Sequence, residues 1–153
     1  FYIARQADAY CVGIDTHGKL QWGETEFDGQ ALLVITDEHC PKAYPDRLSE
    51  QGISWIATGK NGLDLARAME LLAEEFKVER LAITGGGHIN GAFLEAGLLD
   101  EVSFMVAPGI DGRAGMAAVF DGIADKNRPA TRLSLQSVQQ MGETVWMRYK
   151  FKN

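Results

Sequence analysis

This chain has little of three things that mark whole classes of proteins: cysteine, excess positive charge and long hydrophobic runs. Its two cysteines, Cys11 and Cys40, are too few for a disulfide-stabilised scaffold and form no C-x-x-C pair, so we expect reduced thiols in the cytoplasm. The net charge of −6 argues against a nucleic-acid partner, because counterion displacement needs a basic face. No apolar run approaches the ~18 residues of a membrane-spanning helix, so we expect no membrane partner.

The size and composition are those of an ordinary globular domain. The chain has 153 residues, of which 46% are hydrophobic and 24% are charged. A chain of this length buries roughly two thirds of the surface that its unfolded form exposes, so we predict a single domain over 1–153. The sequence starts with Phe1 and is already strand-like at Ala9. We therefore expect it to be the later part of a longer polypeptide.

Short apolar runs alternate with helix-like segments over the first two thirds of the chain. Strands are predicted at 9–14, 31–36, 53–59 and 81–84. Their apolar residues are nearly continuous, which is typical of strands covered on both faces in a parallel sheet. Helices are predicted at 41–51, 63–76 and 88–97, the second with an apolar stripe of Leu65, Met69, Leu72 and Phe76.

The pattern changes near the C-terminus. A strand is predicted at 101–108, followed by a long glycine-containing loop over 109–130. Residues 133–135 and 145–151 then alternate between apolar and polar, which predicts an antiparallel, half-exposed hairpin with its turn at 141–144. Alternating strands and helices build a parallel sheet. We therefore predict an α/β fold with a mixed, mostly parallel sheet, flanked by helices and closed by an antiparallel hairpin.

Three consecutive glycines, at 85–87, stand where a predicted strand ends and a predicted helix begins. Glycine loses more backbone freedom on folding than any other residue, so this turn must need backbone without side chains. The first N–H groups of a helix carry about half a positive charge, and phosphates commonly bind there. The pattern indicates a nucleotide diphosphate on 85–90; the alternative is a tight turn that holds no ligand.

The sequence matches two known nucleotide-binding motifs only in part. The glycine spacing at 85–91 is close to the Rossmann fingerprint, but three predicted strands precede the one that leads into it, and no acidic residue ends the next strand. Residues 13–19 match G-x-x-x-x-G-K, but Leu20 stands where a P-loop needs Ser or Thr. We reject both motifs. Asp15 and Thr16 nevertheless follow a strand end, where ligand-binding loops lie in such sheets.

Neither a metal site nor a hydrolase motif is predicted. His17, His39 and His88 have no partner at metal-ligand spacing, and the sequence contains no G-x-S-x-G. His88 opens the helix after the glycines, where it is either part of the predicted anion site or a solvated first-turn residue.

Residues 81–113, LAITGGGHINGAFLEAGLLDEVSFMVAPGIDGR, resemble the central stretch of the riboflavin-biosynthesis reductase family, the RibD C-terminal domain. The specific part is EAGLLDEVSFMVAP at 95–108. The family's earlier strands are similar to AYCVGIDTHGKLQW at 9–22 and ALLVIT at 31–36. Its closing hairpin is similar to SVQQMGETVWMRYKF at 137–151. The resemblance implies a dihydrofolate reductase-like three-layer fold, with the first part of the domain missing from this sequence.

The same resemblance implies an NADPH-dependent oxidoreductase similar to 5-amino-6-(5-phosphoribosylamino)uracil reductase, acting on a small heterocyclic or sugar-phosphate-bearing substrate, and a homodimer. The implied cofactor-binding residues are Gly85, Gly86, Gly87, His88, Ile89 and Asn90 at the diphosphate, and Thr36, Asp37, Thr58 and Gly59 at the adenosine end. The implied substrate-binding residues are Asp15, Thr16 and Thr84. No catalytic residue is assigned, because the cofactor supplies the hydride.

Thr84 departs from the family pattern, which usually has a carboxylate directly before the glycines and near the substrate. One alternative is therefore an NADP-binding relative without the activity, a regulatory or binding module. Another is a structural domain whose glycines only make a turn. A second open question concerns the hairpin face that carries Trp146 beside Arg148 and Lys150, which is either a solvated strand face or an interface.

Overall fold

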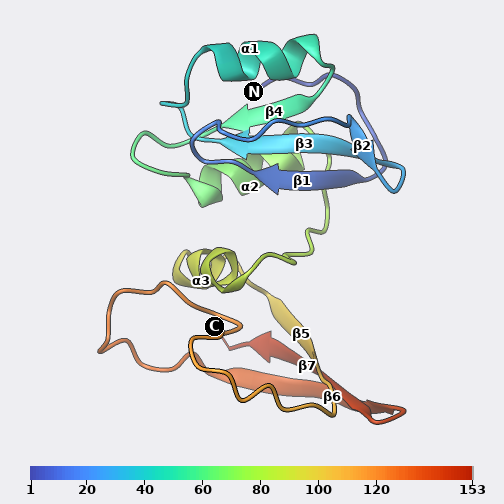
Figure 1. Cartoon of the computed structure of the whole chain (residues 1–153), viewed down its shortest axis with the longest axis vertical. Helices are drawn as coiled ribbons and strands as arrows, with labels where there is room; N and C mark the ends of the chain where they lie inside the picture. Colours follow the sequence, from blue (N-terminus) through green and yellow to red (C-terminus); the bar gives the residue numbers. More distant parts are fainter. Residues whose placement is uncertain (153) are drawn as a thin grey trace. The chain divides into compact units, whose positions relative to one another are not determined.

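The computed structural model describes residues 1–152, which divide after Leu81 into two compact units. The first unit contains a four-stranded sheet and two helices, and the second contains a three-stranded sheet and one helix (Figure 1). None of the helices in this described part of the chain is long and apolar enough to cross a membrane.

The first unit is a small parallel α/β structure. Its elements are β1 (Tyr10–Ile14), β2 (Glu26–Phe27), β3 (Gln30–Thr36), α1 (Ala43–Glu50), β4 (Ser54–Ala57) and α2 (Leu65–Glu74). β3 lies between β1 and β4 and runs parallel to both. The predicted strands at 9–14, 31–36 and 53–59 and the two predicted helices of this unit are therefore confirmed. Two-residue β2, antiparallel to the start of β3, was not predicted.

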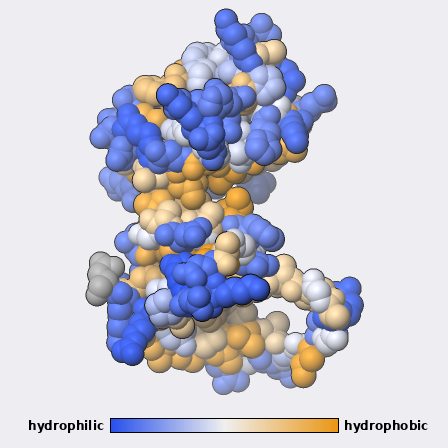
Figure 2. All heavy atoms as spheres, turned by 90° about the vertical axis from the view of Figure 1, so that its left-hand side faces the viewer, coloured by the Kyte–Doolittle hydropathy of each residue, from blue (hydrophilic) through white to orange (hydrophobic). Residues whose placement is uncertain are grey.

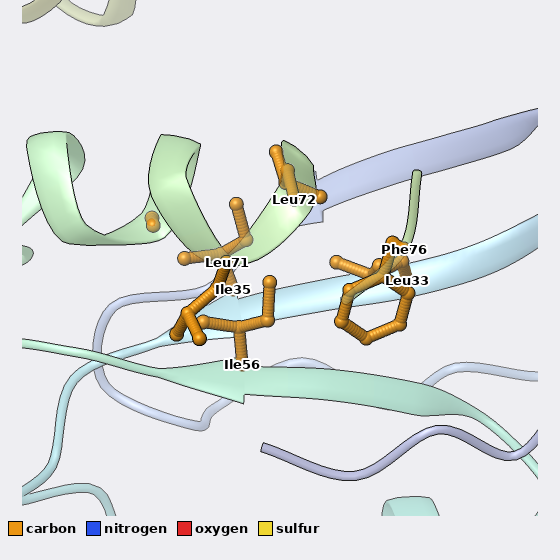
Figure 3. Close-up of a cluster of buried hydrophobic side chains, with 7 residues drawn as sticks. Leu33, Ile35, Ile56, Leu71, Leu72 and Phe76 are labelled. Atoms are coloured by element: carbon orange, nitrogen blue, oxygen red, sulfur yellow. The ribbon is translucent and has the colours of Figure 1, made fainter. Parts of the chain in front are cut away.

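The two helices cover opposite faces of this sheet, because successive side chains of β3 point to opposite sides. Leu33 and Ile35 pack with residues of α2, and Leu32 and Val34 pack with residues of α1. Figure 3 shows the α2 side of this core. α2 ends at Glu74, before the predicted 76, because Lys77 adopts a left-handed φ of 59°.

The second unit is antiparallel. Its elements are α3 (Gly87–Glu95), β5 (Glu101–Val106), β6 (Leu133–Met141) and β7 (Thr144–Phe151). β7 is central and pairs antiparallel with β5 and β6, which confirms the predicted hairpin. Gly142 makes the turn with a φ of 63°, and residues 107–132 form a long loop without helix or strand, as predicted.

The predicted strand at 81–84 does not form. A segment becomes a strand only when a neighbouring strand accepts its backbone hydrogen bonds, and none of the described strands pairs with it. An apolar residue of this segment is partly buried without strand pairing, because Leu81 packs against the α2 side of the first core. The described strands therefore form two sheets, where the sequence predicted one mixed, mostly parallel sheet.

Candidate functional site

The N-terminus of α3 is built by the glycine turn. Gly86 is the N-cap residue, with extended backbone angles of −69° and 176°, and no side chain caps the helix. The first N–H groups of an α-helix have no partner inside the helix, and they lie at the positive end of its dipole. This end of α3 therefore offers N–H donors to an anion.

The glycines around this turn are needed for different reasons. A Cβ on Gly87 would overlap the Ala118 carbonyl oxygen, and a Cβ on Gly91 would overlap the Asp121 carbonyl oxygen. A Cβ on Gly85 would lie 2.8 Å from the Cβ of Ile89. Gly86 is different, because a Cβ there would meet no atom within 4 Å. Its space is open, and its φ would suit any residue.

A segment far along the chain, residues 118–122, packs against this end of α3. The Asp121 N–H donates to the Gly87 carbonyl oxygen at 2.9 Å, and the Asn90 amide Nδ2 donates to the Val119 carbonyl oxygen at 2.8 Å. We call this segment the 118–122 loop. Sequence reasoning missed it; the one available signal was the Asp121–Gly122 turn dipeptide in a glycine-containing stretch.

Six predicted site residues of the first unit lie together at the carboxyl ends of β1, β3 and β4: Asp15, Thr16, Thr36, Asp37, Thr58 and Gly59. Backbone hydrogen bonds join them. The Thr16 carbonyl oxygen accepts the Asp37 N–H at 3.2 Å, and the Thr58 N–H donates to the Thr36 carbonyl oxygen at 3.0 Å. The Gly59 carbonyl oxygen accepts the Glu38 N–H at 2.9 Å.

Side chains at this edge already have partners within the unit. The Thr36 hydroxyl donates to the Thr16 carbonyl oxygen at 3.3 Å, and the Thr58 hydroxyl donates to the Asp64 carbonyl oxygen at 3.0 Å. An Asp37 carboxylate oxygen accepts the N–H of His39 at 2.8 Å. These hydrogen bonds fix the loops at the sheet edge. The hydroxyl protons of Thr36 and Thr58 are both used inside the unit.

The Asp15 side chain is also hydrogen-bonded within the first unit. The residue is 7% exposed, and its carboxylate accepts the Leu20 N–H at 2.7 Å. Burial raises the pKa of this carboxyl, but hydrogen bonds from Leu20, the Tyr44 hydroxyl and neighbouring amides outweigh it and hold the pKa below its ordinary 3.8. The carboxylate therefore organises residues 15–20 from inside.

Tyr44, on α1, continues this network. Its hydroxyl oxygen accepts the indole N–H of Trp22 at 2.8 Å, and the hydroxyl also hydrogen-bonds Asp15. Burial, together with the adjacent Asp15 carboxylate, raises the pKa of Tyr44 to about 12, although the Trp22 donor acts in the opposite direction. The Tyr44 ring also packs on Gly18, whose φ is 63°. No helix directly follows residues 13–19, whereas a P-loop leads into one.

The remaining predicted residues belong to the second unit. Thr84 is exposed and lies in the irregular segment before the turn, and His88 is exposed in the first turn of α3. Across residues 1–152, no group of three or more His, Cys, Asp or Glu side chains could hold a metal ion. Cys11 and Cys40 are free thiols.

The chain matches known proteins over most of its length. A model of the RibD C-terminal domain family matches residues 9–147. A relative from Methanothermobacter thermautotrophicus, named 2,5-diamino-6-ribosylamino-4(3H)-pyrimidinone 5′-phosphate reductase, is 32% identical over 128 residues. The match covers 82% of this chain and 57% of the relative, so the chain spans little more than half of that protein's length.

Two solved structures share the fold. A RibD from Acinetobacter baumannii has a TM-score of 0.73 at 20% identity, covering 92% of this chain and 37% of that one. A pyrimidine reductase-like protein from Corynebacterium diphtheriae has a TM-score of 0.75 at 20% identity, covering 94% of this chain and 61% of that one. These neighbours confirm the predicted dihydrofolate reductase-like fold class. Together with the family match over 9–147, they show that the chain belongs to the RibD C-terminal domain family.

Proposed function

We propose that this chain forms the reductase part of an NADPH-dependent enzyme of riboflavin biosynthesis. Its substrate is a small heterocycle that carries a sugar phosphate, of the class named for the Methanothermobacter relative. Membership of the RibD C-terminal domain family supports the proposal. The family match runs from 9 to 147 and so includes residues of both compact units, which supports treating them as one reductase domain.

The cofactor assignment rests on the open space beside Gly86. Gly85, Gly87 and Gly91 each have a neighbour inside the chain that excludes a Cβ, whereas nothing lies near the missing side chain of Gly86. A glycine without an internal reason, at an uncapped helix N-terminus, fits close approach of a diphosphate to the backbone. The N–H groups of Gly87, His88 and Ile89 would donate to its oxygens.

The rest of the site divides between binding and positioning. We assign Thr36, Asp37, Thr58 and Gly59 to the adenosine end, where the two threonine hydroxyls fix the loops through their bonds within the unit. Thr16 and Thr84 are assigned to the substrate, and Asp15 acts by fixing its loop. When bound, NADPH supplies the hydride. The residues of the chain bind and orient the two reactants.

Binding of NADPH to the full-length protein tests this assignment. We expect Gly86→Ala to weaken NADPH binding at least tenfold in a fluorescence titration, because the added methyl group occupies the open space at the helix start. Its melting temperature should fall only slightly, because the φ of −69° suits alanine although alanine is a poorer N-cap residue than glycine.

Gly109→Ala is the matched control, because a Cβ at Gly109 also meets no atom within 4 Å and lies outside the glycine turn. Unchanged NADPH affinity in Gly86→Ala would contradict the diphosphate assignment. Absence of NADPH binding to the wild type would favour a structural turn.

A second candidate function rests on Thr84. The exposed hydroxyl stands where the resemblance leads us to expect a carboxylate, which favours a relative that binds NADP and lacks the reductase activity. Turnover of the ribosylaminopyrimidine phosphate separates the two candidates. Oxidation of NADPH that depends on this substrate supports the reductase, and tight NADPH binding without turnover supports the regulatory or binding module.

We also propose that the protein is a cytoplasmic homodimer, joined through one face of the β5–β7–β6 sheet. Paired residues share a face, so Val106, Val145, Met147, Val138 and Leu135 lie on the same side. Val106, Val138 and Leu135 are 54, 55 and 54% exposed. Figure 2 shows hydrophobic side chains at the surface in its lower part, where this sheet lies. Apolar sheet faces of this kind mark interaction sites.

The opposite face of the sheet exposes Met105 and Met141, but its polar side chains pair with one another. The Trp146 indole N–H donates to the Ser103 hydroxyl at 2.8 Å, and Arg148 bonds Glu101. The Arg148 guanidinium also lies 6.0 Å from the centre of the Trp146 ring. These contacts favour a solvated face, so the apolar side is the better interface. The two free thiols suit a reducing compartment.

A further inference from the structure

α3 and the 118–122 loop make a close long-range contact in the second unit. Most of the chain between β5 and β6 is exposed, and Ile110 is 99% exposed. At 118–122, however, the chain touches the backbone of α3 so closely that Gly87 and Gly91 have no room for a Cβ. Asn90 supplies the side-chain hydrogen bond of this contact, donated to the Val119 carbonyl oxygen at 2.8 Å.

This contact adds a restraint on one peptide group at the helix start. The Asp121 N–H donates to the Gly87 carbonyl oxygen at 2.9 Å. Because a peptide group is planar, fixing the Gly87 carbonyl also fixes the N–H of His88, which belongs to the same plane. The loop therefore restrains an N–H donor of the uncapped helix end without touching the open space beside Gly86.

We propose that Asn90 is a positioning residue: by holding the 118–122 loop on α3 it orients the His88 N–H. Its effect on the cofactor rests on the proposed function, because the diphosphate is the group that this N–H would bind. Asn90 points its amide at Val119 and so acts through the loop, which differs from the direct cofactor contact that the sequence predicted for it.

The test uses the full-length protein carrying Asn90→Ala, which removes the donor to Val119. In the cofactor-free protein we expect at least tenfold faster hydrogen exchange at the Asp121 amide and a shifted His88 amide resonance. With NADPH we expect KM to rise about fivefold while kcat stays within twofold, because diphosphate contacts are made equally in the ground and transition states.

Two further variants make the result specific. Gly91→Ala disturbs the same contact from the other side, since its methyl group would displace the Asp121 carbonyl, and it should change the same three measurements. Gln139→Ala removes an exposed amide of β6 and should change none of them.

Unchanged exchange at Asp121 in Asn90→Ala overturns the proposal, and so does faster exchange with an unmoved His88 resonance. An unchanged KM for NADPH in a variant with a mobile loop also overturns it. If the wild-type protein binds no NADPH, the proposed function fails by itself. The exchange and resonance measurements then still decide whether Asn90 orients the helix start.

Discussion

Asp15, Tyr44 and Trp22 form a hydrogen-bonded chain inside the first unit. The carboxylate holds the turn at 15–20, the phenol connects that turn to α1, and the indole completes the phenol's bonding. Sequence alone could place Asp15 after a strand. It could not show that the carboxylate faces inward, because Tyr44 lies on a separate helix and carries no motif.

Tyr44→Phe should make the alkaline stability of the protein less dependent on pH. The pKa of Tyr44 is raised from 10.0 to about 12 in the folded state, so its contribution is complete below pH 10 and is lost as the pH rises through 12. We therefore expect the free energy of unfolding to fall more steeply in the wild type than in Tyr44→Phe over this window.

Urea denaturation at a series of pH values measures the difference. Exposed Tyr2→Phe is the control and should follow the wild type. At neutral pH, Tyr44→Phe should be less stable by about 1–3 kcal/mol, because the Trp22 N–H loses its acceptor. Parallel pH curves for wild type and Tyr44→Phe would contradict the raised pKa.

The glycine triple illustrates how far a local pattern reaches. The sequence predicted that 85–87 needs backbone without side chains, and the structure agrees for Gly85 and Gly87. The reason at Gly87 is a carbonyl of the 118–122 loop, about thirty residues later in the chain. No local rule could find that partner, and Gly86 stands out only once the other glycines are explained.

At the scale of elements, hydrophobic periodicity correctly predicted the helices and strands that bury one face. The stripe of α2 and the alternation of β7 each mark a buried or shared face, and both elements form. The strand at 81–84 failed because pairing depends on a neighbour that the sequence does not specify. β2 was not predicted because a strand of two residues is too short to show an alternating pattern. Asp28 and Gly29, both at positive φ, make the turn that joins it to β3.

Asp64 links α2 to the sheet edge, with its side chain at the helix and its backbone carbonyl at the edge. Its side chain caps the helix by accepting the Arg67 N–H at 2.9 Å, and its carbonyl oxygen accepts the Thr58 hydroxyl. Asp64→Ala removes the cap and should lower the free energy of unfolding by about 1 kcal/mol. Urea denaturation measures the loss.

Asp8→Ala is the matched control for this cap, because the Asp8 side chain is exposed and lies outside every helix. It should leave the midpoint of unfolding unchanged. Equal stabilities of the Asp64→Ala and Asp8→Ala variants would show that the cap contributes nothing.

At the scale of the whole molecule, the proposed dimer can be tested with two adjacent residues of β6. Val138 pairs with Met147 on the apolar face, and Gln139 pairs with Trp146 on the polar face. Val138→Lys places a charge in the proposed interface and should convert the dimer into a monomer. Gln139→Lys should leave it dimeric, and sedimentation velocity distinguishes the two states.

A wild-type monomer at micromolar concentration would contradict this dimer, and so would a Val138→Lys variant that remains dimeric. Circular dichroism checks that both variants stay folded, as expected for side chains exposed in the protomer. The sequence predicted the hairpin and its two faces. It did not show which face would be satisfied by internal bonds, because these depend on the register of β5 against β7.

The overlap between Gly91 and the Asp121 carbonyl has a consequence for anyone who reshapes this protein. A library that randomises position 91 alone should return glycine almost exclusively, whereas one that also varies the length of the segment around Asp121 should accept larger residues. The two stretches are therefore a single unit of redesign, although they are far apart in the chain.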